Sequence, residues 1–427
     1  MSSSGRSKLE RKNARLNRRK IAAAAERDAL AQEVEAARVA AISRSRLRRL
    51  PPWLPTLPSA NPQDAAVLRD LNDVSRPVAI CVGEEMVRYC AYTQRVVDAA
   101  RQHIDAAIEH IAEGVHKIWP HASVMCFGSY STGLWLPSSD VDVVVMGLSN
   151  SEDRDVPTRF VPDGVKELEQ LARQLRPQKS WVQRVDVVRG AKVPVAKVML
   201  RRGSVKDGDN STLLRVDISI ENIQTSHGME ASKFVRQYVS DLPRLKPLLM
   251  VIRQFLREKA LNSAFTGGLS SYAVTLLAVF MMEMQRHQEE EEEEQEGGEA
   301  DETPEDKETM RLGQLLLDFL EYYGTSFDYY TTGLSLKPEA FGAYPLAPHL
   351  SNGLPLMPQL VIDDPVDKNG QHNAAAGTFA LARVVAALEN GYFALWYHRP
   401  TQFTPTALCQ LLHWSGHQSR DVSTVKQ

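Results

Sequence analysis

The stretch that decides the fold is CFGSYSTGLWLPSSDVDVVV, which occupies residues 126–145. It sets a Gly-Ser pair after a short apolar run and, further on, two aspartates that alternate with valines. Side chains two residues apart on a strand leave the same face, so Asp140 and Asp142 share one face. The valines beside them fill the other. The pattern predicts a strand with one charged face and one buried face.

The strand carboxylates predict a metal site. Two adjacent carboxylates repel each other, and cations between them offset that cost. A third, Asp217, alternates with apolar residues in RVDISI, residues 215–220. Such hard oxygen ligands favour Mg²⁺ or Mn²⁺ over zinc. With a Gly-Ser turn that lets a phosphate approach the backbone, Asp140, Asp142 and Asp217 predict catalysis of phosphoryl or nucleotidyl transfer by two metal ions. Inert surface aspartates are the alternative.

Apolar spacing divides the chain into a strand-rich part and a helical part. A helix within residues 92–119 is expected to lead into strands at 123–127, 141–146 and 213–220, with a possible fourth at 193–200. After Ser226 the spacing becomes helical, and helices are expected at 230–240, 245–259, 270–286 and 310–323. This order predicts an α+β fold.

The composition excludes several protein classes. The chain has 427 residues, of which 43% are hydrophobic and 24% charged, as in globular proteins. Its longest apolar run, residues 273–282 apart from Thr275, is too short for a bilayer span of roughly 20 residues, so no membrane association is expected. The four cysteines form no CxxC pair, which disfavours a zinc finger or a secreted disulfide framework.

Charge is concentrated in two segments. Residues 1–50 contain fourteen Lys and Arg against five Asp and Glu. Within them, RKNARLNRRK (11–20) suits phosphate contacts or nuclear localisation, and a solubilising tail is the alternative. Residues 289–308 contain thirteen Asp and Glu against one Lys, which predicts an acidic disordered insertion in the helical part.

Taken in order, these motifs resemble a known family. GSYSTGLWLPSSDVDVVV is similar to the catalytic signature of the DNA polymerase β-like nucleotidyltransferases, and more narrowly to noncanonical poly(A) polymerases of the TRAMP-complex type. The resemblance covers roughly residues 76–397 and continues through segments 216–222, 245–280, 322–337 and 361–385. It implies a nucleotidyltransferase domain with a mixed sheet, a mostly helical central (PAP-associated) domain, and a cleft between them.

The resemblance also implies domain boundaries. They are a basic tail at 1–58, a catalytic domain at 95–224, a helical central domain at 76–94 and 225–398 that includes the base-recognition loop, an acidic insertion at 287–309, and a C-terminal tail at 399–427.

Several residues match positions that hold the nucleotide in this family. Gly128 and Ser129 would hold the triphosphate, and Arg253 and Arg257 would touch it from one helix face. Solvated surface arginine is the alternative for that pair. Ser271 would contact phosphate. Tyr272 would stack on the base, although core packing is the ordinary role of a tyrosine on an apolar helix.

The choice of base depends on residues 362–379, which take the place of the family's recognition motif. His372-Asn373 departs from the usual Asn-Asn or Asn-Asp and matches related terminal uridylyltransferases, where the imidazole helps to select uracil. Asp367 falls near an acidic residue of those enzymes. A loop histidine bonded to the backbone is the alternative. Adenylate is the first prediction and uridylate the second.

The predicted activity is template-independent addition of adenylate from ATP to an RNA 3′ end, with release of pyrophosphate. By resemblance, the expected partners are a zinc-knuckle RNA-binding protein and an RNA helicase that feeds the exosome, in the nucleus or the nucleolus. Two competing hypotheses are an inactive scaffold with this fold and a small-molecule nucleotidyltransferase.

Overall fold

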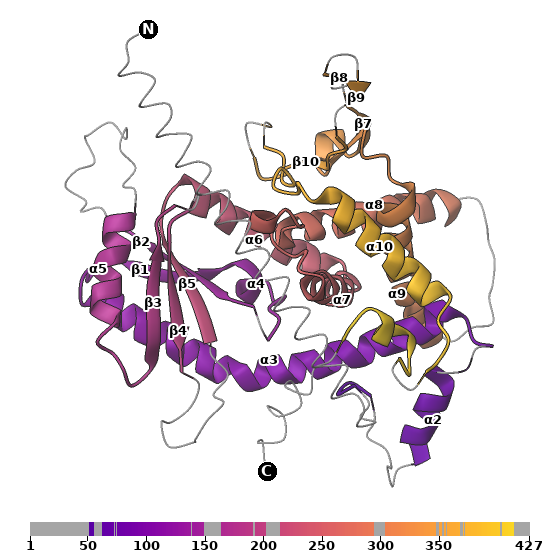
Figure 1. The fold of residues 1–427 in the computed structure, drawn as a ribbon, viewed down its shortest axis with the longest axis horizontal. Coiled ribbons are helices and arrows are strands. Elements are labelled where there is room, and N and C mark those ends of the chain that lie inside the picture. Colours follow the sequence, from indigo (N-terminus) through magenta and orange to yellow (C-terminus); the bar gives the residue numbers. More distant parts are fainter. Residues whose placement is uncertain are drawn as a thin grey trace, which may run out of the picture.

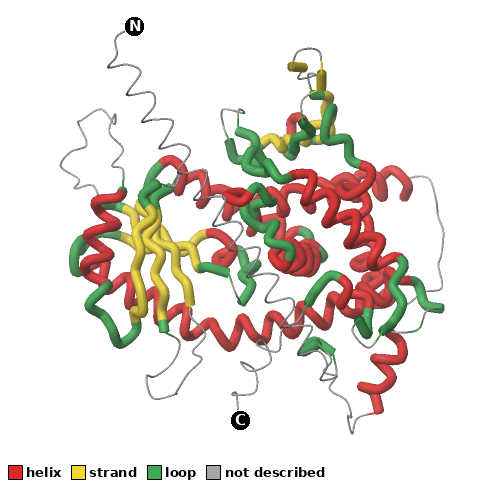
Figure 2. The backbone as a smooth tube through the Cα atoms, viewed as in Figure 1, coloured by secondary structure: helices red, strands yellow, loops and turns green. Residues whose placement is uncertain are grey.

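The structure is a computed structural model. It describes residues 51–413 except 55–61, 72, 74, 138, 149–163, 191–192, 202–213, 294–303, 347–349, 352–353, 356, 368–369, 371 and 402–403. The fold has a strand-rich half and a helical half, and the main sheet lies in the strand-rich half (Figure 1, Figure 2).

A five-stranded mixed sheet forms the first half. Its spatial order is β1-β2-β5-β4-β3, with β2 and β5 parallel and the other neighbours antiparallel. The strands are β1 (Ser123–Phe127), β2 (Val141–Met146), β3 (Val182–Val188), β4 (Val195–Leu200) and β5 (Leu214–Ile220). The predicted α+β fold with a mixed sheet is confirmed. The possible fourth strand is β4, whereas β3 was not predicted.

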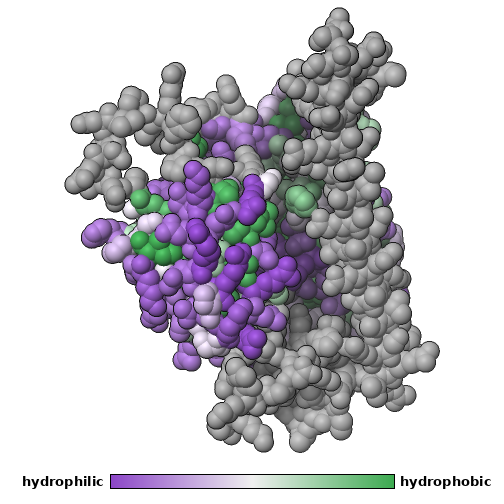
Figure 3. Space-filling view, turned by 60° about the vertical axis from the view of Figure 1, so that its left-hand side comes forward, coloured by the Kyte–Doolittle hydropathy of each residue, from purple (hydrophilic) through white to green (hydrophobic). Residues whose placement is uncertain are grey.

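Two helices bury one face of this sheet. They are α5 (Val165–Leu175) and the later part of α3 (Val78–His116). The apolar face of α5 places Leu168, Leu171 and Leu175 against the valines of the sheet, all with 1% exposure or less. On the outer side of this half, Figure 3 shows mainly hydrophilic residues with smaller hydrophobic patches.

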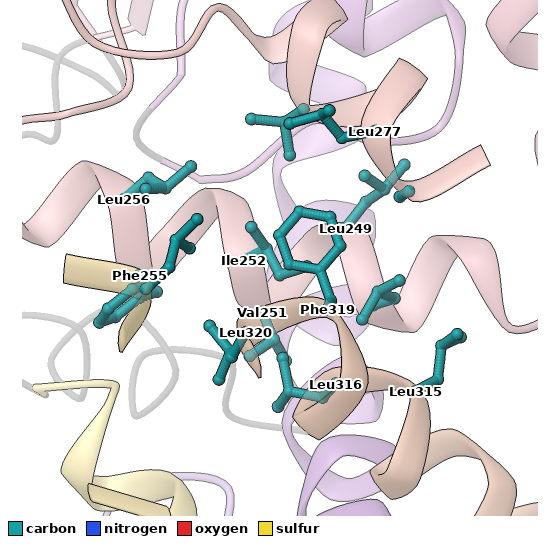
Figure 4. Close-up of a cluster of buried hydrophobic side chains, with 14 of the residues drawn as sticks. Leu249, Val251, Ile252, Phe255, Leu256, Leu277, Leu315, Leu316, Phe319 and Leu320 are labelled. Carbon is teal, nitrogen blue, oxygen red and sulfur yellow. The ribbon is translucent and has the colours of Figure 1, made fainter. Parts of the chain in front are cut away.

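The helical half is built around α7 (Leu245–Glu258). Its leucines, isoleucine and phenylalanine pack against α8 and α9, as Leu249, Ile252 and Phe319 show in Figure 4. The other helices of this half are α2 (Pro62–Leu71), α6 (Ile223–Asp241), α8 (Ser271–Glu293), α9 (Pro304–Glu321) and α10 (Leu381–Trp396). Asn222 begins α6 with a capping box: its side chain accepts from the Thr225 amide, and the Thr225 hydroxyl accepts from the Asn222 amide.

The remaining elements are short. They are α4 (Gly128–Ser131), η2 (Ala264–Thr266), the π-helical η3 (Tyr322–Ser326), β6 (Thr332–Ser335), η4 (Pro338–Ala340), β7 (Gly342–Pro345), β8 (Leu350–Ser351), β9 (Leu354–Pro355), β10 (Val361–Asp363) and η5 (Ala407–Gln410). Strands β10, β6 and β7 form a small sheet that precedes the predicted base-recognition loop.

The 39-residue helix α3 passes under both halves (Figure 1). Its first part, up to Tyr92, packs in the helical core, and its later part, from Ala100, packs in the sheet core. The domain boundary predicted at 94/95 therefore lies inside one unbroken helix.

Both predicted tails contribute to the helical core. The Glu85 side chain on α3 is fully buried and accepts bonds from Trp53 Nε1 at 2.9 Å and from the Leu408 amide at 2.8 Å. The Thr406 hydroxyl donates to the same carboxylate. The predictions of a tail through residue 58 and from residue 399 are therefore wrong for 51–54 and for 406–412. Both segments contain apolar side chains that are buried in this core, namely Trp53, Leu54, Leu408, Leu411 and Leu412. Residues 1–50 lie outside the described residues.

The acidic insertion predicted at 287–309 needs a similar correction. Helix α8 continues to Glu293 and α9 begins at Pro304, so both edges are helical. A glutamate run has good helix propensity when it extends an existing helix, which offsets part of its repulsion. Residues 294–303 lie outside the described residues. Within the described part of the chain, none of the helices is both long and apolar enough to span a bilayer.

Candidate active site

Strand register places the predicted carboxylates together. In the parallel pair β2–β5, Asp142 lies directly opposite Asp217. Asp140 stands one residue before β2 and two before Asp142. Val141 and Val216, which point the other way, are completely buried. The sheet core thus fixes the direction in which the three carboxylates leave the strands.

Two of the three carboxylates have basic neighbours on adjacent positions of the sheet. Arg215 Nε lies 2.7 Å from Asp140 Oδ1, and Lys197 Nζ lies 2.9 Å from Asp217 Oδ2. Asp142 has no ion-pair partner among the residues that the structure describes. Negative charge is therefore incompletely balanced where β2 and β5 meet.

This imbalance raises carboxylate pKa values. Burial, followed by repulsion from Asp217 and Asp140, raises the pKa of Asp142 to about 7. Burial also raises the pKa of Asp217, although Lys197 opposes that shift. A cation between these groups opposes the shift, because an opposite charge favours the ionised form. The donor set of carboxylate oxygens fits Mg²⁺ or Mn²⁺.

Gly128 is required beside this cluster for two reasons. Its φ of +65° lies in the left-handed region, and a Cβ there would lie 2.3 Å from Asp142 Oδ2. Its amide donates to Ser232 Oγ on α6 at 2.9 Å. The amide is therefore already bonded within the chain, so Gly128 shapes the site by closeness, while Ser129 lines the adjacent cavity.

The cavity has a volume of about 530 Å³, within the range usual for small-ligand sites. It lies between the two halves. Asp140, Asp142 and Arg215 line one side, and Ser271 and Tyr272 line the other. It therefore brings together residues that are far apart in the sequence.

Two arginines on α7 form a further wall of the cavity. Arg253 and Arg257 both line it, but neither is a solvated surface residue. Arg253 is 7% exposed and donates from Nη1 to the Leu134 carbonyl, which holds the segment after α4 against α7. Burial lowers the pKa of Arg253 to about 10 and also lowers that of Arg257. One buried and one half-buried positive charge facing a cavity favour an anionic ligand.

The side of the cavity that contains Ser271 and Tyr272 is held together by Asp364, which sequence reasoning did not single out as a site residue. Its carboxylate accepts from the Tyr272 hydroxyl at 2.9 Å and lies 2.8 Å from both His227 Nε2 and His372 Nδ1. Burial, followed by the charge of this carboxylate, raises the pKa of Tyr272. Tyr272 is thus held in place by its hydroxyl, with its ring at the cavity wall.

The three residues predicted to select the base lie behind this wall. None of Asp367, His372 and Asn373 is among the residues that line the cavity. Asn373 holds the loop together: its Oδ1 accepts from the amides of Ile362 and Ala375, and its Nδ2 donates to a carbonyl. Asp367 Oδ2 accepts from the His372 amide at 2.8 Å. Their role in base selection therefore stays a prediction.

Sequence reasoning also missed residues at the carboxylate side. Arg215 was detectable, because it stands two residues before Asp217 and so shares its face of the strand. Lys197 was detectable only if the fourth strand was accepted and its register known. Ser232 and His227 carry no local signal, since packing of α6 against α4 alone brings them to the cavity.

Comparison with known proteins agrees with this geometry. Residues 85–240 match the family described as poly(A) RNA polymerase, mitochondrial-like, central palm domain, and residues 311–370 match the Cid1 family of poly(A) polymerases. Poly(A) RNA polymerase protein 2 of Saccharomyces cerevisiae is 29% identical over 315 residues, which are 72% of this chain and 46% of that protein. The chain is similar in sequence to the noncanonical poly(A) RNA polymerases. The resemblance of the motifs is thereby confirmed.

Other noncanonical poly(A) polymerase relatives extend the comparison. The chain is 30% identical over 233 residues, 54% of its length, to the inactive noncanonical poly(A) RNA polymerase protein Trf4-2 of Drosophila melanogaster, of which it covers 48%. The polymerase core of TRAMP, an RNA surveillance complex, has the same fold, with a TM-score of 0.58 and 24% identity over 82% of this chain and 99% of that one. The chain spans between about a third and a half of the first curated relatives that it matches.

Proposed function

We propose that the protein is a template-independent RNA 3′-end nucleotidyltransferase that transfers adenylate from ATP and releases pyrophosphate. The observation that carries the proposal is the cluster of Asp140, Asp142 and Asp217 at one level of the sheet. Its charge is incompletely balanced, and it faces a cavity lined by the buried Arg253 and the half-buried Arg257.

In this proposal the three aspartates hold two Mg²⁺ or Mn²⁺ ions, which supply activation of the 3′-hydroxyl and neutralisation of the triphosphate. Arg253 and Arg257 provide positive charge for the triphosphate. Ser129 and Ser271 offer hydroxyl donors from opposite sides of the cavity. Tyr272 offers a ring for stacking, and its bond to Asp364 holds that ring in position. The chain thus contributes mainly positioning, which is the larger protein contribution in phosphoryl transfer.

Kinship alone does not decide activity, because one relative is described as inactive. The presence of all three carboxylates, with Asp142 and Asp217 in register and Asp140 just before β2, supports an active enzyme over a scaffold. Adenylate is proposed because the curated relatives described above carry poly(A) in their names.

Uridylate transfer is the second candidate. It is favoured by His372, which lies in the predicted recognition segment and is bonded to the same carboxylate as Tyr272. The rest of the family likeness favours adenylate.

We further propose a role in nuclear RNA surveillance. The likeness to the polymerase core of TRAMP, an RNA surveillance complex, supports partners of a surveillance complex. The zinc-knuckle RNA-binding protein, the RNA helicase and the exosome implied by the motifs complete this proposal. The surplus of basic residues in 1–50 supports nuclear entry or contact with RNA phosphates.

The test is primer extension. The purified protein is incubated with a 3′-hydroxyl RNA oligonucleotide, Mg²⁺ or Mn²⁺, and ATP, UTP, CTP or GTP separately, with Asp140→Ala as the negative control. Extension chiefly with ATP supports the proposal, and extension chiefly with UTP replaces it by the second candidate. No primer extension with any of the four nucleotides, even after addition of an RNA-binding partner, contradicts both the adenylate and the uridylate candidates.

A further inference from the structure

A second group of ligand-type side chains lies beside the cavity, separate from the three strand aspartates. His227 comes from α6, whereas Asp364 and His372 come from the segment that follows β10. One nitrogen of each imidazole points at the same oxygen, Asp364 Oδ2, at 2.8 Å. The three ligand atoms all lie within 4.8 Å of one another.

The central carboxylate is buried without a permanent positive charge. The Asp364 side chain is 0% exposed, and both of its ion-pair partners among the described residues are histidines. A buried carboxylate needs a compensating charge as well as hydrogen bonds. Either protonated imidazole or a bound cation supplies that charge here.

The donor set matches a transition-metal site better than a magnesium site. Two imidazole nitrogens and one carboxylate oxygen are the ligands that Zn²⁺ takes in sites with three protein ligands. Ligand atoms around tetrahedral zinc lie about 3.4 Å apart, so the observed 2.8 Å contacts need only small adjustments.

Two further features fit a metal site. Tyr272 donates to the other oxygen, Asp364 Oδ1, at 2.9 Å, as outer partners of a ligating carboxylate commonly do. The side chains of His227 and His372 remain 32% and 43% exposed, which leaves an entry path and room for a water as fourth ligand.

We propose that His227, Asp364 and His372 bind one Zn²⁺-class ion that fastens the segment after β10 to helix α6. The ion then joins the predicted base-recognition loop to helix α6, which directly follows strand β5 and its Asp217. It also fixes the acceptor of the Tyr272 hydroxyl at the cavity wall. This site does not depend on nucleotidyl transfer, because its ligands are a different set from the strand aspartates.

The experiment measures metal binding directly. The full chain is freed of metal with a chelator, and Zn²⁺ is titrated by calorimetry, with Co²⁺ absorption as a report on coordination. The variants are His227→Asn and His372→Asn, each at a partly exposed position that tolerates the change. His110→Asn is the matched control, because its imidazole bonds only to a backbone carbonyl of its own helix. Asp142→Ala in parallel removes the strand site.

We expect one equivalent of Zn²⁺, a Co²⁺ spectrum typical of four-coordination, and a Zn²⁺-dependent rise in Tm. Each ligand variant should weaken binding at least tenfold, and Tyr272→Phe, which removes an outer hydrogen bond, should weaken it about 10–100-fold. His110→Asn and Asp142→Ala should bind as the parent does. Equal affinity in the parent and both ligand variants, or loss of binding only in Asp142→Ala, overturns the proposal. So does a parent that binds no Zn²⁺, and in that case protonated imidazole balances Asp364. Primer extension is read separately, so its outcome does not affect this one.

Discussion

Two opposite walls of the cavity are built in different ways. The carboxylate wall contains Asp140 and Asp142, and the base wall contains Ser271 and Tyr272. On the carboxylate wall, positions follow from backbone register, with Asp142 opposite Asp217 on paired strands. On the base wall, positions follow from side-chain bonds that converge on Asp364 from α6, α8 and the segment after β10. A wall fixed by a sheet keeps its geometry when one side chain changes. A wall fixed by a single buried carboxylate depends on each bond.

The largest effect should come from the carboxylate wall. Asp142→Ala removes a proposed metal ligand worth several kcal/mol, so turnover should fall at least about a thousandfold. The fold should remain, because the β2 side chains that pack in the core point the other way. Primer extension and circular dichroism measure the two quantities. Asp186→Ala, on strand β3 outside the cavity, is the control. Full turnover in Asp142→Ala would rule out the mechanism.

Gly128→Ala tests whether closeness to the carboxylates matters more than backbone strain. The new Cβ meets Asp142 Oδ2 at 2.3 Å, and a misplacement near 1 Å can cost about a hundredfold in rate. Gly133→Ala is a matched control with a similar φ of +72° and open space around the Cβ. It should lose only about 1–2 kcal/mol of stability and keep turnover. Equal turnover losses would assign the effect to strain alone.

Tyr272 separates stacking from hydrogen bonding on the base wall. Tyr272→Ala should raise the KM for the nucleotide by an amount equivalent to about 1–3 kcal/mol, because it removes the stacking ring. Tyr272→Phe keeps the ring and loses only the bond to Asp364, so its KM should rise less. Steady-state kinetics on both variants decides the matter. A phenylalanine variant as impaired as alanine would show that the hydroxyl, not the ring, matters.

The pH dependence of stability reports on the unbalanced charge of the carboxylate wall. Because the folded pKa of Asp142 is about 7, above its ordinary value, folding favours the protonated acid. That stabilisation is complete below pH 4 and is lost as the pH rises through 7, by at most about 1.4 kcal/mol per pH unit. Urea unfolding of metal-free protein at pH 5 and 8 should show this loss. Asp142→Asn should reduce it; an unchanged loss would assign it to other groups.

The smallest effect on catalysis should come from the Glu85 network, which lies outside both walls. Glu85→Gln replaces one acceptor oxygen by an amide NH₂, which cannot accept from the donors of Trp53, Thr406 and Leu408. The free energy of unfolding should therefore fall by about 1–3 kcal/mol. The kcat and KM values should not change. Glu84→Gln, next to it but bonded to partly exposed Arg76, is the control and should lose less. A change in kcat would link this network to the cavity.

Sequence predicted the carboxylate wall well because it is local. The alternation around Asp140 and Asp142 encodes the face of a strand directly, and Asp217 repeats the pattern. Helices α6, α7, α8 and α9 of the second half were also predicted, since leucine spacing on α7 and α9 follows the buried face. The ends of these four differ, as where α8 runs on into the glutamates, and α2 and α10 were not predicted.

On the base wall, Ser271 and Tyr272 were predicted, whereas the network around Asp364 was not, because it depends on distant contacts. Asp364 gains its role only when His227 from α6 arrives beside it, and no local pattern signals that approach. The same reason explains the ends of the chain. Trp53 and Thr406 meet at Glu85 although more than 300 residues separate them in the sequence.

The continuous helix α3 has a mechanical consequence. It anchors side chains in both cores, and the other direct crossing, from β5 to α6, is only two residues long. Neither connection contains a flexible linker. Moving the two halves apart to widen the cavity therefore requires α3 to bend, and a continuous helix resists bending. We expect the proposed RNA substrate to enter and leave through small movements of the two halves rather than through a large domain opening.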